Sequence, residues 1–436
     1  MIILMKYLKI LLFNLKKMLE IKGGKELSWV VEISGSKNAC LPILGASLLV
    51  NWKITLKNVP RIWDVLTFLE IIEELWAKVD FKENWVLNLD TSNLDIDKLN
   101  LEKIKKIRAS ILLLSPILFF FKKIKIPFPG GCSIWARPID SHLNWLKAIW
   151  YNYIFDGENI ELNWELKSWN IVLNWGFWVT STENLIVANV LRQWETIIKN
   201  SAIEPHVMNL IDFLRKAWAD IKIRYDHTII IKWVDNLVDN FEFEIVYDYI
   251  ESGTFIIIWA LASKDFIDIK NARIVDLYSF LEKLKEAWVK FEDLWNDVLR
   301  VYRAKNIKNI NIQTNIFPAF PTDLQSPFAV LQTQANWISK IHEVLFEWRL
   351  NWLVELETMW ANIIILNPHQ AIINGPTKFK SWKTVTSWDL RAWASMVIAW
   401  IITEWITKVE KVEYIFRGYE NFVEKLQELW VQITKK

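Results

Sequence analysis

The segment FLEKLKEAWVKF, residues 280–291, contains the pattern that decides the fold. Its Phe and Leu residues recur at helical spacing, Trp288 interrupts the pattern, and a short strand-like run follows. Similar segments are FLEIIEELWAKV, HLNWLKAIWYNY, LIDFLRKAWADI, LVELETMWANI and FVEKLQELWVQI. The six tryptophans stand at 76, 150, 218, 288, 360 and 430, at intervals of 74, 68, 70, 72 and 70 residues. The chain therefore contains six copies of an internal repeat.

Each repeat also contains short strand-like runs, for example Val30–Ile33, Ile54–Leu56, Ile229–Ile231 and Ile363–Leu366. Helices that alternate with strands predict an α/β or α+β protein in which helices pack against sheets. The 436 residues are enough for two or three domains with cores of their own.

Tryptophan and glycine have unusual frequencies in this chain. There are 28 Trp and 11 Gly, whereas ordinary usage of about 7% Gly would give roughly thirty. Several Trp follow Asn, where Asn-Gly is the usual tight-turn pair, and six end the repeated helices, where glycine is the usual residue. We therefore hypothesise that the printed tryptophans are glycines in the living protein. The alternative is a genuinely tryptophan-rich protein that stacks sugars or bases.

Composition excludes several classes of function. The net charge of +2 gives no basic field for nucleic acid. Two distant cysteines, Cys40 and Cys132, favour a reducing compartment, so we expect a cytoplasmic protein. No His or Cys pair has metal-site spacing, and no apolar run is long enough to span a bilayer. The apolar, lysine-containing residues 1–17 are expected to be an extension outside the fold.

The segment PFPGGCSIWARPIDSH, residues 127–142, carries the strongest chemical signal. Its prolines and paired glycines predict a shaped loop. The loop presents Cys132 close to Arg137, and nearby positive charge favours the reactive thiolate. The alternative is that Cys132 is a small buried residue and the charges form a solvated turn.

This loop resembles the active-site lid of the UDP-N-acetylglucosamine enolpyruvyl transferase family. The family pattern Pro-Gly-Gly-Cys, then Ile-Gly-Ala-Arg-Pro and Asp, corresponds here to 129–132, 134–138 and Asp140, with Trp135 in place of glycine. The resemblance extends from about residue 18 to 434. Further matching motifs are SGSKNA at 34–39, RAS at 108–110, TEN at 182–184, FPTDLQ at 320–325, EVLFEWR at 343–349, DLRA at 389–392 and RGYE at 417–420.

The resemblance implies an α/β fold, a two-domain inside-out α/β barrel with helices inside and sheets outside. Each domain would contain three βαβαββ-like units, and the chain would cross twice between the domains. By that pattern one domain comprises 18–36 and 246–436, and the other comprises 37–245 and carries the Cys132 loop. The substrates would bind between the domains.

The resemblance also implies transfer of the enolpyruvyl group from phosphoenolpyruvate to UDP-N-acetylglucosamine, the first committed step of peptidoglycan biosynthesis. The implied catalytic residues are Cys132 as proton donor, Asp323 as base, Lys37, and Arg417 as a phosphoenolpyruvate clamp. The implied substrate-binding residues are Lys37, Asn38, Arg108, Arg137, Pro138, Ile139, Asp140, Ser141, Gly176, Phe177, Trp178, Val179, Asp323, Leu345, Asp389, Arg391 and Arg417. No cofactor or metal is implied, and neither nucleic acid nor membrane is an expected partner.

Considered without the resemblance, these motifs leave alternatives open. Lys37 can also be interpreted as a solvated lysine at a plain helix start. Arg108 can be interpreted as a surface charge, and Asp323 as a helix cap. Two other functions remain. The related 3-phosphoshikimate enolpyruvyl transferase lacks the Pro-Gly-Gly-Cys lid. A non-catalytic nucleotide-sugar-binding protein would result if the 28 tryptophans are genuine and crowd the site.

Overall fold

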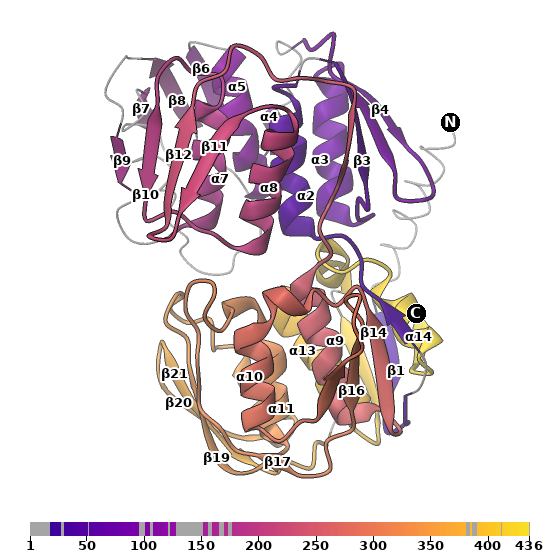
Figure 1. Ribbon diagram of the computed structural model, residues 1–436. Helices are drawn as coiled ribbons and strands as arrows, with labels where there is room; N and C mark the ends of the chain where they lie inside the picture. Colours follow the sequence, from indigo (N-terminus) through magenta and orange to yellow (C-terminus); the bar gives the residue numbers. More distant parts are fainter. Residues whose placement is uncertain are drawn as a thin grey trace. The chain divides into compact units, whose positions relative to one another are not determined.

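The computed structural model describes residues 18–27, 30–50, 52–95, 101–104, 108–120, 123–127, 151–155, 159–164, 170–172, 177–380, 384–385, 390–410 and 412–435. They form two compact units (Figure 1). Unit 1 takes the residues up to Ser34 and from Tyr247 on, and unit 2 lies between Gly35 and Val246. The predicted crossings follow residues 36 and 245, and the predicted extension 1–17 lies outside the described residues.

Three helices form the centre of unit 1: α9 (Tyr249–Ala262), α11 (Gln325–Thr333) and α13 (Leu390–Ile401). They contact one another. Every residue of α11 is buried, as are nearly all those of α9 and α13. Helices that are apolar on all sides belong in a core. The outer helices α10 (Tyr278–Glu286), α12 (Leu353–Thr358) and α14 (Phe422–Glu428) bury only one face.

Three sheets surround these helices, with strand orders β15-β16-β14-β2, β17-β19-β21-β20 and β22-β23-β1-β24; β18 also pairs with β19. Their bounds are β1 (Met18–Lys22), β2 (Val30–Glu32), β14 (Phe266–Lys270), β15 (Phe291–Asp293), β16 (Leu299–Tyr302), β17 (Ile307–Lys308), β18 (Ile312–Gln313), β19 (Ala335–His342), β20 (Asn362–Asn367), β21 (Gln370–Gly375), β22 (Thr384–Val385), β23 (Ile406–Glu410) and β24 (Gln432–Lys435).

Unit 2 repeats this plan. Its helices are α2 (Lys37–Ser47), α3 (Trp63–Glu74), α4 (Leu101–Ile104), α5 (Leu114–Phe120), α7 (Val179–Asn189) and α8 (Pro205–Lys216). Its sheets are β13-β3-β5-β4, β11-β12-β10-β9 and β6-β8-β7. Their bounds are β3 (Lys53–Lys57), β4 (Lys78–Phe81), β5 (Leu87–Asp90), β6 (Lys123–Pro127), β7 (Tyr151–Phe155), β8 (Asn159–Trp164), β9 (Asn170–Val172), β10 (Thr196–Lys199), β11 (Asp220–Arg224), β12 (Thr228–Lys232) and β13 (Phe241–Glu244).

Four of the six described sheets share one strand order, which confirms the predicted repeat. The chain runs β9-α7-β10-α8-β11-β12, and the strands lie in the order β11-β12-β10-β9 with β9 parallel to β10. The sheets of α9, α11 and α2 have the same order, and in the sheet of α13 the N-terminal strand β1 takes the place of the last strand. The α/β class and the βαβαββ unit were therefore predicted correctly.

The tryptophans that end the repeated helices occupy a backbone conformation that favours glycine. Among the described residues, φ is +66° at Trp76, +73° at Trp218, +66° at Trp288, +76° at Trp360 and +74° at Trp430. The last four are each the left-handed residue of a Schellman motif. After α8, for example, the 218 N–H donates to the 215 carbonyl at 2.9 Å and the 219 N–H to the 214 carbonyl at 2.9 Å. The sixth repeat tryptophan, at 150, lies outside the described residues.

Other tryptophans are buried in the centre of unit 1. Trp259 on α9 and Trp393 and Trp400 on α13 are at most 1% exposed. Their indole N–H groups find no hydrogen-bond partner among the described residues. A buried indole N–H normally has a partner. Glycine at these positions would leave no such donor, so this finding supports the glycine hypothesis independently of φ.

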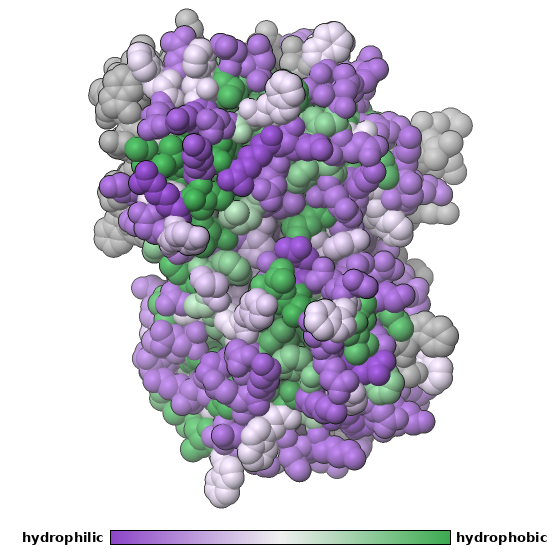
Figure 2. Space-filling model, viewed as in Figure 1, coloured by the Kyte–Doolittle hydropathy of each residue, from purple (hydrophilic) through white to green (hydrophobic). Residues whose placement is uncertain are grey.

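The surface of both units is mixed in character. On the face shown in Figure 2, hydrophilic side chains cover much of each unit, with paler and apolar ones scattered among them. The repeat-end tryptophans are among the exposed side chains, from 58% at Trp76 to 74% at Trp218. Among the described residues, no helix has the length and apolar character needed to cross a membrane.

Candidate functional site

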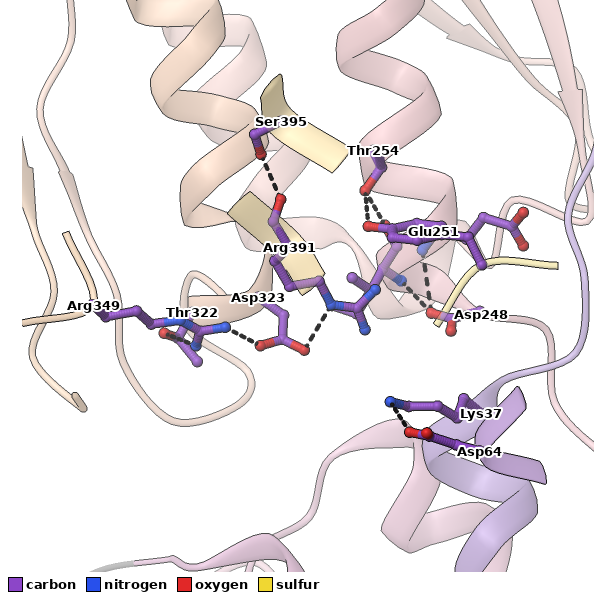
Figure 3. Close-up of polar contacts among 12 residues, drawn as sticks. Lys37, Asp64, Asp248, Glu251, Thr254, Thr322, Asp323, Arg349, Arg391 and Ser395 are labelled. Atoms are coloured by element: carbon purple, nitrogen blue, oxygen red, sulfur yellow. Dashed lines mark hydrogen bonds and ion pairs between the residues drawn. The ribbon is translucent and has the colours of Figure 1, made fainter. Parts of the chain in front are cut away.

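Asp323 lies between two arginines in unit 1. The extended backbone of Pro321 leads into a 3-10 turn, η4 (Thr322–Leu324), immediately before α11. Arg349 Nη2 donates to Asp323 Oδ1 at 2.6 Å, and Arg391 Nε donates to Oδ2 at 3.2 Å (Figure 3). Leu324, the residue after Asp323, occupies the N-cap position of α11. The two guanidinium groups balance a carboxylate that is still 29% exposed and open to reaction.

Arg391 is held by groups from three parts of unit 1. Its side chain, near the start of α13, is 5% exposed. Burial alone would lower the pKa of this guanidinium, but Tyr419, Asp323 and Asp248 together raise it. The centre of the Tyr419 ring lies 5.1 Å from the guanidinium carbon of Arg391, and the Tyr419 hydroxyl lies 2.9 Å from Thr254 Oγ1. The arginine therefore stays charged although it is buried.

Asp248 connects this cluster to the start of α9. Its Oδ1 accepts from the N–H groups of Ile250 at 2.8 Å and Glu251 at 3.2 Å, which caps the helix (Figure 3). Burial raises the pKa of Asp248, and Arg391 acts in the opposite direction. The cap thus fixes one end of α9 and places a partly compensating charge behind Arg391.

A second set of hydrogen bonds lies behind Arg349. Its Nη1 donates to Thr322 Oγ1 at 2.6 Å, and Thr322 Oγ1 donates to Glu343 Oε2 at 2.6 Å. The other oxygen of Glu343 accepts from Leu345 N at 3.0 Å. Leu345, a predicted substrate contact, is therefore connected through Glu343 and Thr322 to Asp323.

Arg417, the remaining predicted residue of unit 1, ends the 3-10 helix η5 (Val412–Arg417) and is half-buried. Tyr419, two residues on, is the residue that contacts Arg391. The RGYE motif thus contributes to the Asp323 cluster through its tyrosine.

Lys37 in unit 2 is not a freely solvated lysine. It opens α2 after Ser36, whose side chain caps the helix by accepting from Ala39 N. Lys37 Nζ donates to Asp64 Oδ2 at 3.2 Å, and these side chains are 15% and 7% exposed. Asp64, in the first turn of α3, offsets the unfavourable placement of a cation at a helix start. The neighbouring Asn38 is half-buried.

The other predicted residues of unit 2 are partly described. Trp178 precedes the first residue of α7, Val179, and Phe177 has φ +44° and packs edge-on against His227 at 4.9 Å. Arg108 begins a 3-10 helix, η2 (Arg108–Leu113), and α5 follows it directly. Outside the described residues lie Cys132, Arg137, Pro138, Ile139, Asp140, Ser141, Gly176 and Asp389.

Several residues of these clusters were not predicted from the sequence. Arg349 was part of the quoted EVLFEWR motif, and its spacing of six from Glu343 was the available signal. Asp248 was not among the predicted site residues. Asp64 carried no signal, because its importance depends on its packing beside Lys37. Among the described residues, no group of three His, Cys, Asp or Glu is arranged to hold a metal ion.

Comparison with known proteins extends over nearly the whole chain. The family described as "EPSP synthase (3-phosphoshikimate 1-carboxyvinyltransferase)" matches residues 21–426. A UDP-N-acetylglucosamine 1-carboxyvinyltransferase of Prochlorococcus marinus (strain MIT 9301) is 39% identical over 96% of this chain and 91% of its own length. A protein of that name from Thermotoga maritima is 35% identical over 95% of this chain and 98% of its own length.

Solved structures share the fold. The enolpyruvyl transferase NikO from Streptomyces tendae has a TM-score of 0.87 at 20% identity, with 96% of this chain and 98% of that chain covered. An EPSP synthase from Acinetobacter baumannii has a TM-score of 0.68 at 14% identity, with 96% and 100% covered. The predicted enolpyruvyl transferase fold is confirmed.

Proposed function

We propose that this chain, which belongs to the EPSP synthase family, transfers the enolpyruvyl group of phosphoenolpyruvate to the 3′-hydroxyl of UDP-N-acetylglucosamine and releases phosphate. The observation that carries this proposal is the 39% identity, over nearly the whole chain, to a relative named for this reaction. The buried arginine pair on Asp323 supports it, because such a site is suited to acid–base chemistry beside anionic substrates.

In the proposed reaction, one bond forms and one bond breaks at the enolpyruvyl carbon. The 3′-oxygen of the sugar bonds to that carbon, and the bond from the carbon to the phosphate oxygen breaks. Asp323 takes the proton of the 3′-hydroxyl, which its partly exposed carboxylate can reach. Cys132 is the proposed donor of a proton to the methylene carbon, and a proton of the resulting methyl group returns to the Cys132 thiolate when phosphate leaves and the double bond re-forms.

The remaining predicted residues divide between the two substrates. Lys37, Arg137 and Arg417 would neutralise the phosphate and carboxylate of phosphoenolpyruvate, with Asn38 and Arg108 assisting. The nucleotide-sugar would contact Leu345, Arg391, Asp389, the 138–141 segment and the 176–179 segment. No metal or cofactor takes part in the proposed reaction. We place the enzyme in the cytoplasm, in agreement with its two widely spaced cysteines.

Phosphate release from phosphoenolpyruvate tests the proposal. The full chain is assayed as printed and with glycine at all 28 Trp positions, each with UDP-N-acetylglucosamine, with shikimate 3-phosphate and with neither. We expect release only with the nucleotide-sugar. The Asp323→Asn variant, which keeps the shape of the side chain and loses the base, serves as the matched control.

Each alternative outcome has a definite meaning. Release only with shikimate 3-phosphate would replace the proposed acceptor by the one in the family description. Ligand-dependent tryptophan fluorescence without any release would favour the non-catalytic binding protein.

A further inference from the structure

Glu343 is a completely buried carboxylate that serves two segments of the candidate site. It directly follows β19 and is 0% exposed. Its Oε1 accepts from Thr314 Oγ1 at 2.9 Å and Leu345 N at 3.0 Å, and its Oε2 accepts from Thr322 Oγ1 at 2.6 Å. Among the described residues no lysine or arginine pairs with it. Its two carboxylate oxygens accept hydrogen bonds from these three donors.

The bond to Thr322 determines what Arg349 can do. A threonine hydroxyl has one proton to donate, and here the proton goes to Glu343, which leaves the oxygen lone pairs for Arg349 Nη1. The guanidinium is rigid and planar, so the bond at Nη1 sets the direction of Nη2. Nη2 is the atom that holds Asp323 Oδ1 at 2.6 Å. Glu343 therefore controls the orientation of Arg349 without touching Asp323.

The other oxygen of Glu343 fixes a second part of the site. Leu345 N–H donates to Oε1, and Val344 N–H donates at 3.0 Å to Thr314 Oγ1, which itself donates to Oε1. The 343–345 turn is thus folded around the carboxylate. The Glu343 side chain therefore holds the segment that contains Leu345. Through Thr322 it also holds Arg349, the arginine that binds Asp323.

We propose that Glu343 is a positioning residue for the reaction: through Thr322 it orients Arg349 on Asp323, and through Leu345 N–H it sets the segment that meets the nucleotide-sugar. This inference rests on the proposed function. The described charged and titratable groups around Asp323 are Arg349, Arg391, Glu343 and, beyond Arg391, Asp248 and Tyr419.

The Glu343→Gln variant of the full chain tests the proposal. The backbone donor of Leu345 cannot be reversed, so the amide oxygen must stay beside it and the amide NH₂ must face Thr322. Thr322 Oγ1 then accepts from the amide, so its hydroxyl proton must turn away from residue 343, which reorients the lone pair that Arg349 Nη1 uses. We expect kcat to fall on the order of 100-fold, as for a misplaced catalytic group. We also expect the acid limb of kcat, which follows the ionisation of Asp323, to move to higher pH.

Matched threonine variants separate positioning from stability. Thr322→Val should reproduce both effects, and Thr322→Ser, which keeps the hydroxyl, should restore the parent kcat and acid limb. Thr314→Val removes a hydroxyl from the other oxygen of the same buried carboxylate; it should lower the unfolding midpoint and leave the acid limb unmoved.

The outcomes distinguish this inference from the proposed function. If the parent chain releases phosphate and Glu343→Gln keeps the parent kcat and acid limb, the positioning role is refuted. A Glu343→Gln variant that only unfolds more easily would make the residue structural and would equally refute it. If Glu343→Gln does not fold, the Thr322 pair alone decides. A parent without nucleotide-sugar-dependent release would refute the proposed function first.

Discussion

Replacing the repeat-end tryptophans with glycine should stabilise the protein. The five positions are 76, 218, 288, 360 and 430, all with φ between +66° and +76°. A residue with a side chain costs about 1–2 kcal/mol in this conformation, and glycine costs about 0.5–1 kcal/mol through the greater freedom of the unfolded chain. The expected net gain is therefore about 1 kcal/mol per site.

Little packing would be lost in exchange, because all five indoles are more than half exposed. Lys380 lies 4.2 Å from the ring of Trp360 and Lys308 lies 5.6 Å from that of Trp288. Each such exposed contact stabilises by about 0.5–1 kcal/mol, so these two sites should gain least. Distant sites add, so the five changes together should contribute about 3–4 kcal/mol once the two lost cation–π contacts are subtracted. This is comparable with the about 5–15 kcal/mol by which domains are stable.

Urea unfolding of the full chain, followed by circular dichroism, measures this gain. The matched control has alanine at the same five positions, which removes the indole but keeps the Cβ that is strained at positive φ. We expect the glycine variant to unfold at higher urea than both the parent and the alanine variant. Equal midpoints for the glycine and alanine variants would refute the reasoning from backbone conformation. Mass spectrometry of the protein from its own host then decides the glycine hypothesis, since a mass that matches 28 tryptophans would exclude it.

Three further predictions concern single side chains. Asp323→Asn should lower kcat by about 10²–10⁴-fold, the usual contribution of a general base, with nucleotide-sugar binding retained in calorimetry. A thiol-reactive phosphoenolpyruvate mimic should label Cys132 only, because Cys40 is fully buried and burial raises the pKa of its thiol; peptide mapping that finds label on Cys40, or full activity after labelling, would contradict this. Burial, together with Glu204, raises the pKa of Glu183 well above its usual value. The folded state therefore keeps a proton that the unfolded state loses, and stability falls by about 1.4 kcal/mol per pH unit as pH rises from about 4.5 towards the folded pKa. Glu183→Gln should remove this slope in unfolding measurements at pH 5 and pH 8.

The local parts of the fold were readable from the sequence. Each repeated helix has its own apolar spacing and its own terminating position, and each is confirmed where the structure describes it, at α3, α8, α10, α12 and α14. Helix periodicity and helix termination depend on neighbours within a few residues, so a single sequence contains them. The spacing of about 70 residues then predicted the repeated unit.

Strand order could not be read in the same way. β1 pairs with β23 and β24 at the opposite end of the chain, and β2 joins the sheet of β14. These pairings join segments hundreds of residues apart, and nothing in the local pattern of β1 specifies them.

The sequence by itself determined the repeat, the α/β class and the motif that contains Asp323, because these depend on spacing along the chain. Only the tertiary structure decided which charges meet: Arg391 and Arg349 reach Asp323 from positions 68 and 26 residues away, and Glu343 reaches Thr322 across 21. Burial then made these contacts strong, because a buried charge must find a partner or a set of hydrogen bonds. Burial is a property of the folded chain, so it could not be predicted from a local sequence pattern.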